Sequence, residues 1–438
     1  MASPTSAASL AASADSELLV WLRHRGGSCA SGVRVGQNLG ERGLFASEDV
    51  PADATLLSVP VDLHIRAPTD DGIGVEREDD RLALEMLRVR NLGNPSPEWA
   101  VWAASLPAHK PGLSRPCYAT PLYWSDATIE LLGDAALIST IKRQHSRVRR
   151  RYENLSLAQR KTLSEMQNGR SPPAWANVLH MIVFNTYRWA YTTIRSRAAY
   201  LDGESSIVPV GDLFNHSTTA PNVAAAYDAA ARAYVYTATQ PIAAGDELLV
   251  SYGAHDNATL LKHYGFVPRG PNPHDRVAVT LDDAPATNLA TGAAARAWLA
   301  EQGFDSGHAL THDGPSFELL AALRLRHATD DEYRNGAAFA IAEGEAVSDA
   351  NEARVWRAVG DLARALARPP SEAEDDRRRI DALRQKPNVE AAEAHELLAR
   401  EFRAARAALV EANVARAERE ARERDGEGGG KRRRTQAH

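Results

Sequence analysis

The chain of 438 residues is long enough for two or three domains, and its 44% hydrophobic and 25% charged residues exclude disordered and collagen-like classes. A net charge of −6 argues against nucleic acid as the main partner, because phosphate binding requires a basic surface. Its two cysteines, Cys29 and Cys117, are too few for a disulfide framework or a cysteine-rich zinc cluster, and no apolar run reaches the ~20 residues of a membrane span.

The first 14 residues are small and hydroxylated and contain neither Arg nor Lys. This composition favours a disordered N-terminus over a cleaved transit peptide, which is also Ser-rich but carries Arg. Structure is predicted to begin with a helix that Asp15 or Ser16 caps and that Gly26-Gly27 ends. A β-rich module is then predicted from short strands at 33–37, 43–47 and 55–61.

Residues 78–199 show long helical periodicity inside this module. A helix at 174–199 is predicted after Pro172-Pro173, and its density of aromatic residues indicates a buried helix. Basic residues gather in the stretch 138–168, namely Lys142, Arg143, Arg147, Arg149, Arg150 and Arg151. They form either a basic patch for an acidic partner or a solvated helix face balanced by nearby Glu. The net negative charge of the chain favours the solvated face.

Short strands are predicted again at 206–210, 222–227, 233–238 and 246–251, with a tight reversal at Gly245-Asp246. A short helix at 256–263 and a strand at 276–281 follow, and then helices to about residue 420. Ser371 is placed to cap one of these helices. The tail joins a Gly run to KRRR, a cluster too short to identify a nuclear signal. The predicted fold class is α+β, with an interrupted β module and a helical C-terminal domain.

Two segments crowd polar and aromatic residues where a predicted strand ends: IVPVGDLFNHS at 207–217 and ELLVSYGAHDNATLLKHYGFV at 247–267. Asp212 and His216 are candidate metal ligands, but no third ligand lies near them in sequence. An Asn-His loop that closes its own backbone hydrogen bonds is the favoured alternative. Taken singly, Tyr252 and Tyr264 are more typical of packing residues than of a site.

Together with GERGLFASEDVPADATLLSVP at 40–60, these segments resemble the SET-domain methyltransferases, in the branch typified by the Rubisco large-subunit lysine methyltransferase. The motifs stand in that branch's order, with Gly40 to Ala46, RSRA at 195–198, DLFNHS at 212–217, SYG at 251–253, DNA at 256–258 and YGF at 264–266. The stretches 319–332 and 351–356 resemble its helical substrate-binding domain. The resemblance covers about residues 16–410, and the ordered set is specific although each motif alone is weak.

The resemblance implies a SET domain with a pseudoknot at 15–270, interrupted by the insertion at 78–199. It also implies a helical substrate-binding domain at 271–420 and a flexible basic tail at 421–438. The implied activity is methyl transfer from S-adenosyl-L-methionine to the ε-amine of a lysine on a folded protein. The implied cofactor-binding residues are Gly40, Glu41, Arg42, Gly43, Arg197, Asn215, His216 and Phe266. Tyr252 is the implied catalytic residue, while Asp212 and Tyr264 are implied to bind the substrate.

The sequence departs from the family pattern at a few positions. Glu41 stands where the first motif usually has Gly, a change that backbone contacts to a cofactor tolerate. The related actin-histidine methyltransferases carry Asn, Trp and Ser where this chain has Ala199, Gly211 and Tyr264, so lysine is favoured over histidine. Histidine methylation and a catalytically silent SET-fold adaptor remain the alternatives.

We expect a monomer that binds a protein substrate through the SET channel and the helical domain, with no nucleic acid, no membrane and no metal involved. The cytoplasm is the expected location, with plastid or nucleus as alternatives.

Overall fold

The computed structural model describes residues 17–38, 41–69, 75–90, 98–107, 118–169, 182–201, 203–281 and 292–425. The predicted disordered N-terminus, the cap residues Asp15 and Ser16, Gly40 and the KRRR cluster all lie outside these ranges. The chain divides into two units, and each is described by itself. The first comprises residues 1–255, 259–266 and 388–396, and the second comprises the rest of the chain.

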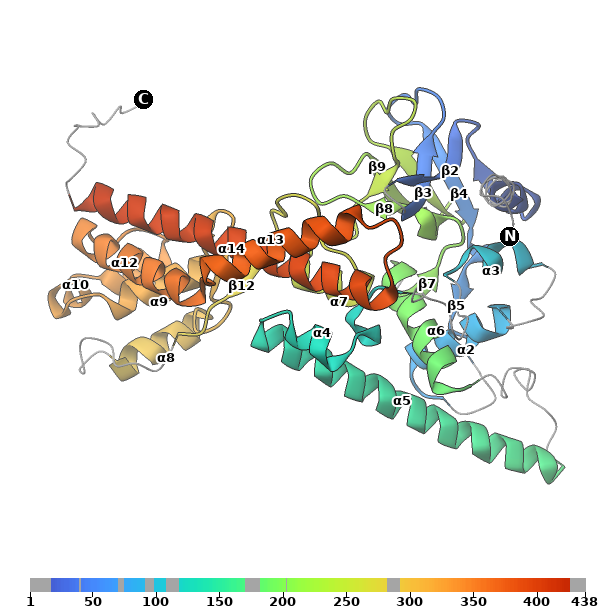
Figure 1. Cartoon of the computed structure of the whole chain (residues 1–438), viewed down its shortest axis with the longest axis horizontal. Coiled ribbons are helices and arrows are strands. Elements are labelled where there is room, and N and C mark those ends of the chain that lie inside the picture. The colour runs from blue at the N-terminus through green and yellow to red at the C-terminus, as the bar shows by residue number, and fades with distance from the viewer. Residues whose placement is uncertain are drawn as a thin grey trace. The chain divides into compact units, whose positions relative to one another are not determined.

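The first unit is built on small, mostly antiparallel sheets, which the alternation of short apolar runs with Gly and Pro predicts (Figure 1). One hairpin joins β2 (Val33–Asn38) to β3 (Glu41–Ala46). A second sheet has the order β1 (Ser28–Cys29), β4 (Thr55–Pro60), β10 (Ala233–Ala238) and β9 (Val223–Asp228). A third has the order β5 (Ile65–Arg66), β7 (Glu204–Ile207) and β6 (Ala198–Leu201). The smallest is a parallel pair, β8 (Asn215–His216) and β11 (Leu249–Val250).

The helical insertion is confirmed. It contains α2 (Glu78–Arg90), α3 (Ala100–Ser105), α4 (Asp126–Glu130), α5 (Ala135–Gln167) and α6 (Phe184–Arg197). The aromatic helix α6 is buried as predicted, with Tyr187 and Trp189 inaccessible to solvent. Tyr187 donates a hydrogen bond of 2.6 Å to the carboxylate of Asp80 on α2, and Arg151 on α5 bonds the same carboxylate at 2.7 Å. This shared carboxylate ties α2, α5 and α6 together.

Two boundaries predicted in this unit are wrong. The described part of the helix expected at 174–199 is only α6, because Val183 is extended (φ −117°, ψ 160°) and Ala198 opens β6. The strand expected at 206–210 ends at Ile207, because Val210 has a φ of 70° and a 3₁₀ turn follows at Gly211–Leu213. A left-handed backbone at a β-branched residue is strained, and it turns the chain away from the sheet toward Asp212.

The second unit is largely helical, as predicted, and contains α8 (Gly292–Gln302), α9 (Phe317–Arg326), α10 (Asp330–Arg334), α11 (Ala337–Ala342), α12 (Asp349–Leu366), α13 (Pro370–Gln385) and most of α14 (Ala391–Arg424). Its core packs apolar side chains of α9, α12 and α14, including Leu323, Val355, Val359 and Val410. A three-stranded sheet of β12 (Arg276–Ala278), β13 (Ala309–Thr311) and β14 (Gly314–Pro315) was not fully predicted. No described helix of either unit combines the length and apolarity that crossing a membrane requires.

Two further predictions for this unit are corrected. Ser371 does not cap α13, because the helix begins one residue earlier at Pro370, which is favoured at a first helical position. The tail expected from residue 421 starts later, since α14 continues to Arg424.

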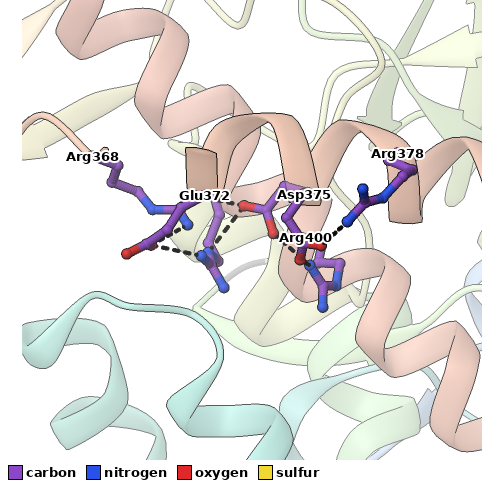
Figure 2. A network of polar contacts seen from close by, with 7 residues as sticks. Arg368, Glu372, Asp375, Arg378 and Arg400 are labelled. Carbon is purple, nitrogen blue, oxygen red and sulfur yellow. Dashed lines mark hydrogen bonds and ion pairs between the residues drawn. The ribbon is translucent and has the colours of Figure 1, made fainter. Parts of the chain in front are cut away.

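A charged network joins α13 to α14 inside the second unit (Figure 2). Its centre is Asp376, a carboxylate only 1% exposed, which pairs with Arg368 at 2.5 Å, Arg400 at 2.7 Å and Arg403 at 3.2 Å. Asp375 and Glu372 satisfy the outer sides of these guanidinium groups. A buried carboxylate shared by three arginines therefore holds the two helices together.

We predict that Asp376→Ala lowers the free energy of unfolding by about 3–5 kcal/mol, because three guanidinium groups lose their buried counter-charge. Urea denaturation measures the change. Asp381→Ala, an exposed position on the same helix, is the control and should shift stability by less than about 0.5 kcal/mol. Equal losses in the two variants would contradict a central role for Asp376.

Candidate functional site

The two sequence segments singled out above meet through the parallel pair β8–β11. Asn215 lies opposite Leu249, and His216 lies opposite Val250. The side chain of Asn222 reinforces this pairing, since its Nδ2 donates to the Glu247 carbonyl at 2.9 Å and its Oδ1 accepts from the Leu249 amide at 2.7 Å. The pairing delivers Tyr252 beside His216, whose Nδ1 accepts a 3.0 Å hydrogen bond from the Tyr252 amide.

The Tyr252 phenol is held from three directions. Its hydroxyl donates a 2.6 Å hydrogen bond to the Phe214 carbonyl. Its ring stacks on His216 with centroids 5.0 Å apart and on Tyr264 with centroids 4.9 Å apart. Burial raises the pKa of Tyr252, although the nearby Arg197 opposes this shift, so the hydroxyl stays protonated at neutral pH. Tyr252 is therefore a rigid, neutral phenol rather than a base.

A wall of aromatic rings continues from Tyr252 through the end of α7 (Asn257–Tyr264). The Phe266 ring lies 6.4 Å from Tyr264 and 6.1 Å from His216. The turn between them depends on Gly265, which has a φ of 81° and whose added Cβ would lie 2.8 Å from the Thr120 amide nitrogen. The rings of His216, Tyr252, Tyr264 and Phe266 all stay partly exposed, which distinguishes this wall from the buried core.

The polar end of the site is formed by β3 and by Asn215. The Asn215 Nδ2 donates to the Arg42 carbonyl at 3.1 Å and to Glu247 Oε1 at 2.7 Å. Gly43 lies against this pair, and an added Cβ there would be 2.6 Å from Glu247 Oε1 and 2.7 Å from Asn215 Nδ2. Glu41 is exposed at the start of β3. The backbone of β3 can therefore approach Asn215 only because residue 43 has no side chain.

Arg197, at the end of α6, makes a partly buried ion pair with Asp212. Its Nη1 donates to both the carbonyl and Oδ2 of Asp212, at 2.9 Å each, and the Asp212 side chain is 1% exposed. Burial alone would lower the pKa of Arg197, but Asp212 raises it overall, so the guanidinium stays charged. Within the described part of the chain, Arg197 Nε and Asp212 Oδ1 are buried without a hydrogen-bond partner. Each is thus a polar atom that a ligand would satisfy.

The structure brings the described candidate residues into one region of the first unit, while Gly40 lies outside the described residues. The sequence analysis missed Glu247, the Phe214 carbonyl and Tyr236, which supports Phe214 by stacking at 4.4 Å. One feature of the sequence could have pointed to Glu247, because it is an acidic residue that directly follows the Gly245-Asp246 turn. Nothing in the sequence indicates a role for a backbone carbonyl. Across the described ranges, no three His, Cys, Asp or Glu side chains are grouped to hold a metal ion.

Comparison with known proteins identifies both units. The SET domain family matches residues 41–253, and the Rubisco LSMT substrate-binding family matches residues 291–409. An actin-histidine N-methyltransferase of Dasypus novemcinctus is 24% identical in an alignment of 379 positions that covers 80% of this chain and 61% of that protein. SET domain-containing protein 4 of Mus musculus is 28% identical in an alignment of 251 positions that covers 54% of each chain. This chain thus spans about three fifths of the length of the actin-histidine relative.

A solved structure has the same fold as this chain. The crystal structure of the SET domain of LSMT bound to lysine and AdoHcy has a TM-score of 0.65 and 20% sequence identity. The alignment covers 94% of this chain and 92% of that chain. The chain therefore carries a SET domain at residues 41–253, followed by a Rubisco LSMT substrate-binding domain at residues 291–409.

Proposed function

We propose that the protein is an S-adenosylmethionine-dependent protein-lysine N-methyltransferase. The observation that carries this proposal is Tyr252, a neutral phenol fixed by the Phe214 carbonyl and stacked between two rings in a partly exposed aromatic wall. When bound, S-adenosylmethionine supplies a methyl group activated by a positively charged sulfonium. Such a displacement needs alignment and exclusion of water more than a strong acid or base, and Tyr252 offers alignment.

The polar end of the site suits the cofactor. Gly43 leaves the β3 backbone open next to Asn215, and Arg197 Nε is a buried donor that suits a carboxylate. Phe266 and His216 present aromatic faces against which an adenine ring can stack. We propose that the residues that hold the cofactor are Glu41, Arg42, Gly43, Arg197, Asn215, His216 and Phe266, together with Gly40.

The aromatic wall suits a lysine side chain. Tyr252 and Tyr264 shield the amine from water, and desolvation lowers the pKa of an amine, which favours the neutral form that attacks. The Tyr252 hydroxyl proton is engaged by the Phe214 carbonyl, so the lone pairs of the phenol oxygen are what it offers to the methyl C–H groups. The buried acceptor Asp212 Oδ1 is a further contact for the substrate.

Histidine is the second candidate target, because actin-histidine N-methyltransferases are among the relatives of this chain. Two features favour lysine. Tyr264 occupies the wall where those enzymes carry Ser. The Trp that they carry at the position of Gly211 has no room here, because an added Cβ at Gly211 would lie 2.1 Å from the Tyr236 hydroxyl.

The helical second unit is proposed to bind the protein substrate. Support comes from its match to the Rubisco LSMT substrate-binding family over residues 291–409. In this proposal the first unit carries out the methyl transfer, and the second unit recognises the folded protein substrate.

The identity of the target residue is tested by incubating the enzyme with S-adenosylmethionine and a proteome from cells that lack it. We expect mass spectrometry to detect new methyl-lysine and no new methyl-histidine. New methyl-histidine without methyl-lysine would establish the second candidate, and no new methylation would favour a silent adaptor.

We predict that Tyr252→Phe lowers kcat about 100-fold and leaves the Kd for S-adenosylmethionine unchanged, because the hydroxyl acts on the reacting methyl group and amine. Radiometric methylation assays and calorimetric titration measure the two quantities. Tyr234→Phe removes a hydroxyl from β10 outside the site and serves as the control. Unchanged turnover in Tyr252→Phe would remove this residue from the mechanism.

We predict that Gly43→Ala raises the Kd for S-adenosylmethionine about tenfold without unfolding the protein. The new methyl group must displace Glu247 Oε1 and Asn215 Nδ2, which are ends of side chains and therefore move at low cost. Gly36→Ala, opposite Gly43 in the hairpin, controls for general damage to β2 and β3. If both variants weakened binding equally, the effect would belong to the hairpin and not to Asn215.

A further inference from the structure

The basic stretch of α5, for which the sequence leaves two interpretations open, lines a cavity of about 750 Å³ in the first unit. The walls come from the start of α2, the long helix α5, the end of α6 and the end of α7, helices that Figure 1 labels. Seven arginine and lysine side chains line this basic cavity, against one carboxylate, Asp79. The chain as a whole carries a net charge of −6, so this concentration of positive charge is local.

Most of this charge is not neutralised within the protein. Arg151 pairs with Asp79 at 3.2 Å and with Asp80 at 2.7 Å. Within the described ranges, no carboxylate forms an ion pair with the other five arginines of the lining, Arg77, Arg143, Arg147, Arg150 and Arg195. Arg143, Arg147 and Arg150 are exposed, as the interpretation of a solvated face predicts. Lys142 pairs with Glu130 at 2.5 Å, but no described Glu side chain balances the three arginines. Like charges held around one concavity repel each other, and an anionic ligand would relieve that repulsion.

The lining also holds polar atoms without partners. Gln144 is 9% exposed, and its Oε1 has no hydrogen-bond partner among the described residues. His263 Nδ1 is also buried without a hydrogen-bond partner among the described residues. Burial, helped by the nearby Lys262 and Arg195, lowers the pKa of His263 to about 3, so its ring is neutral. A neutral imidazole carries one N–H, which His263 can donate to an anion, whereas Gln144 Oε1 is an acceptor and does not contribute to anion binding.

The basic cavity adjoins the aromatic wall of the candidate site. Lys262 and His263 directly precede Tyr264 in α7, and Arg195 stands two residues before Arg197 at the end of α6. Arg195 lies near enough to Tyr264 to oppose the rise in its pKa that burial causes. A ligand in the basic cavity would thus lie close to the residue that enters the wall.

We propose that the basic cavity binds an acidic segment, rich in Asp and Glu, of the protein substrate and so guides the target residue toward Tyr252. That this segment belongs to a substrate rests on the proposed function, whereas the anion site rests on the residues that line the cavity. The volume suits a few side chains, and the negative charge of the whole chain disfavours a nucleic acid. Electrostatic complementarity of this kind contributes mainly to association rate and specificity.

The anion site is tested on the full chain by fluorescence anisotropy with labelled hexa-glutamate as the probe. We expect the wild type to bind hexa-glutamate, but not hexa-glutamine, and to bind it more weakly as salt rises. The double charge reversal Arg147→Glu/Arg150→Glu should weaken binding at least tenfold. Arg160→Glu, an exposed reversal on α5 outside the cavity, should leave it unchanged. Equal binding by the two variants, or tighter binding of a hexanucleotide than of hexa-glutamate, would overturn the proposal.

Methylation assays separate this inference from the proposed function. With an identified substrate, the double reversal should raise KM at least tenfold while kcat and the Kd for S-adenosylmethionine stay at wild-type values. A wild-type KM in the folded double variant would overturn the guiding role and leave lysine methylation intact. Hexa-glutamate binding without methylation of any protein would instead overturn the proposed function and leave the anion site standing.

Discussion

The candidate site depends on the parallel pairing of β8 with β11, which consists of only two residue pairs. The pairing of β8 with β11 joins segments more than thirty residues apart and places His216 beside Tyr252. So short a ladder is not stable by itself, so its geometry depends on neighbours. The Asn222 side chain bonds the β11 backbone, and Phe214 anchors β8 by stacking on Tyr236. All proposed contacts to the cofactor and the substrate depend on this junction, the β8–β11 pair.

The junction also separates two kinds of surface. On the side of β3, Asn215 and Glu247 form a polar end; on the side of α7, Tyr252, Tyr264 and Phe266 form an aromatic wall. A charged sulfonium donor and a neutral amine have opposite needs, since one gains from polar contacts and the other from exclusion of water. Asn215 and His216 are adjacent in sequence but contact the polar end and the aromatic wall respectively, because successive residues of a strand face opposite sides.

The sequence predicts the larger elements because each carries its own local signal. Gly and Pro residues flank β2, β3 and β4, and the density of aromatic residues in α6 identifies a buried helix. The strands it misses, β1, β5, β6, β8, β13 and β14, have two to four residues and exist only through their partners. In the candidate site, motif residues such as Tyr252 can be named from the sequence, whereas the Phe214 carbonyl that accepts its hydrogen bond cannot, because any residue type supplies a carbonyl. The charge on α5 was predicted only in part, because ion pairing depends on neighbouring elements: Lys142 pairs with Glu130, whereas Arg147 and Arg150 have no carboxylate partner among the described residues.

Gly211 has a consequence for how such a protein changes over evolutionary time. The Tyr236 hydroxyl occupies the space that any side chain at position 211 would need, and the Tyr236 ring in turn supports Phe214 and hence the Tyr252 hydroxyl. A bulky residue at 211 is therefore tolerable only after Tyr236 has become smaller, and that first step loosens Tyr252. The two positions are epistatic, and their effects will not add. A bulky residue at position 211 is therefore expected to be accepted only together with a change at Tyr236.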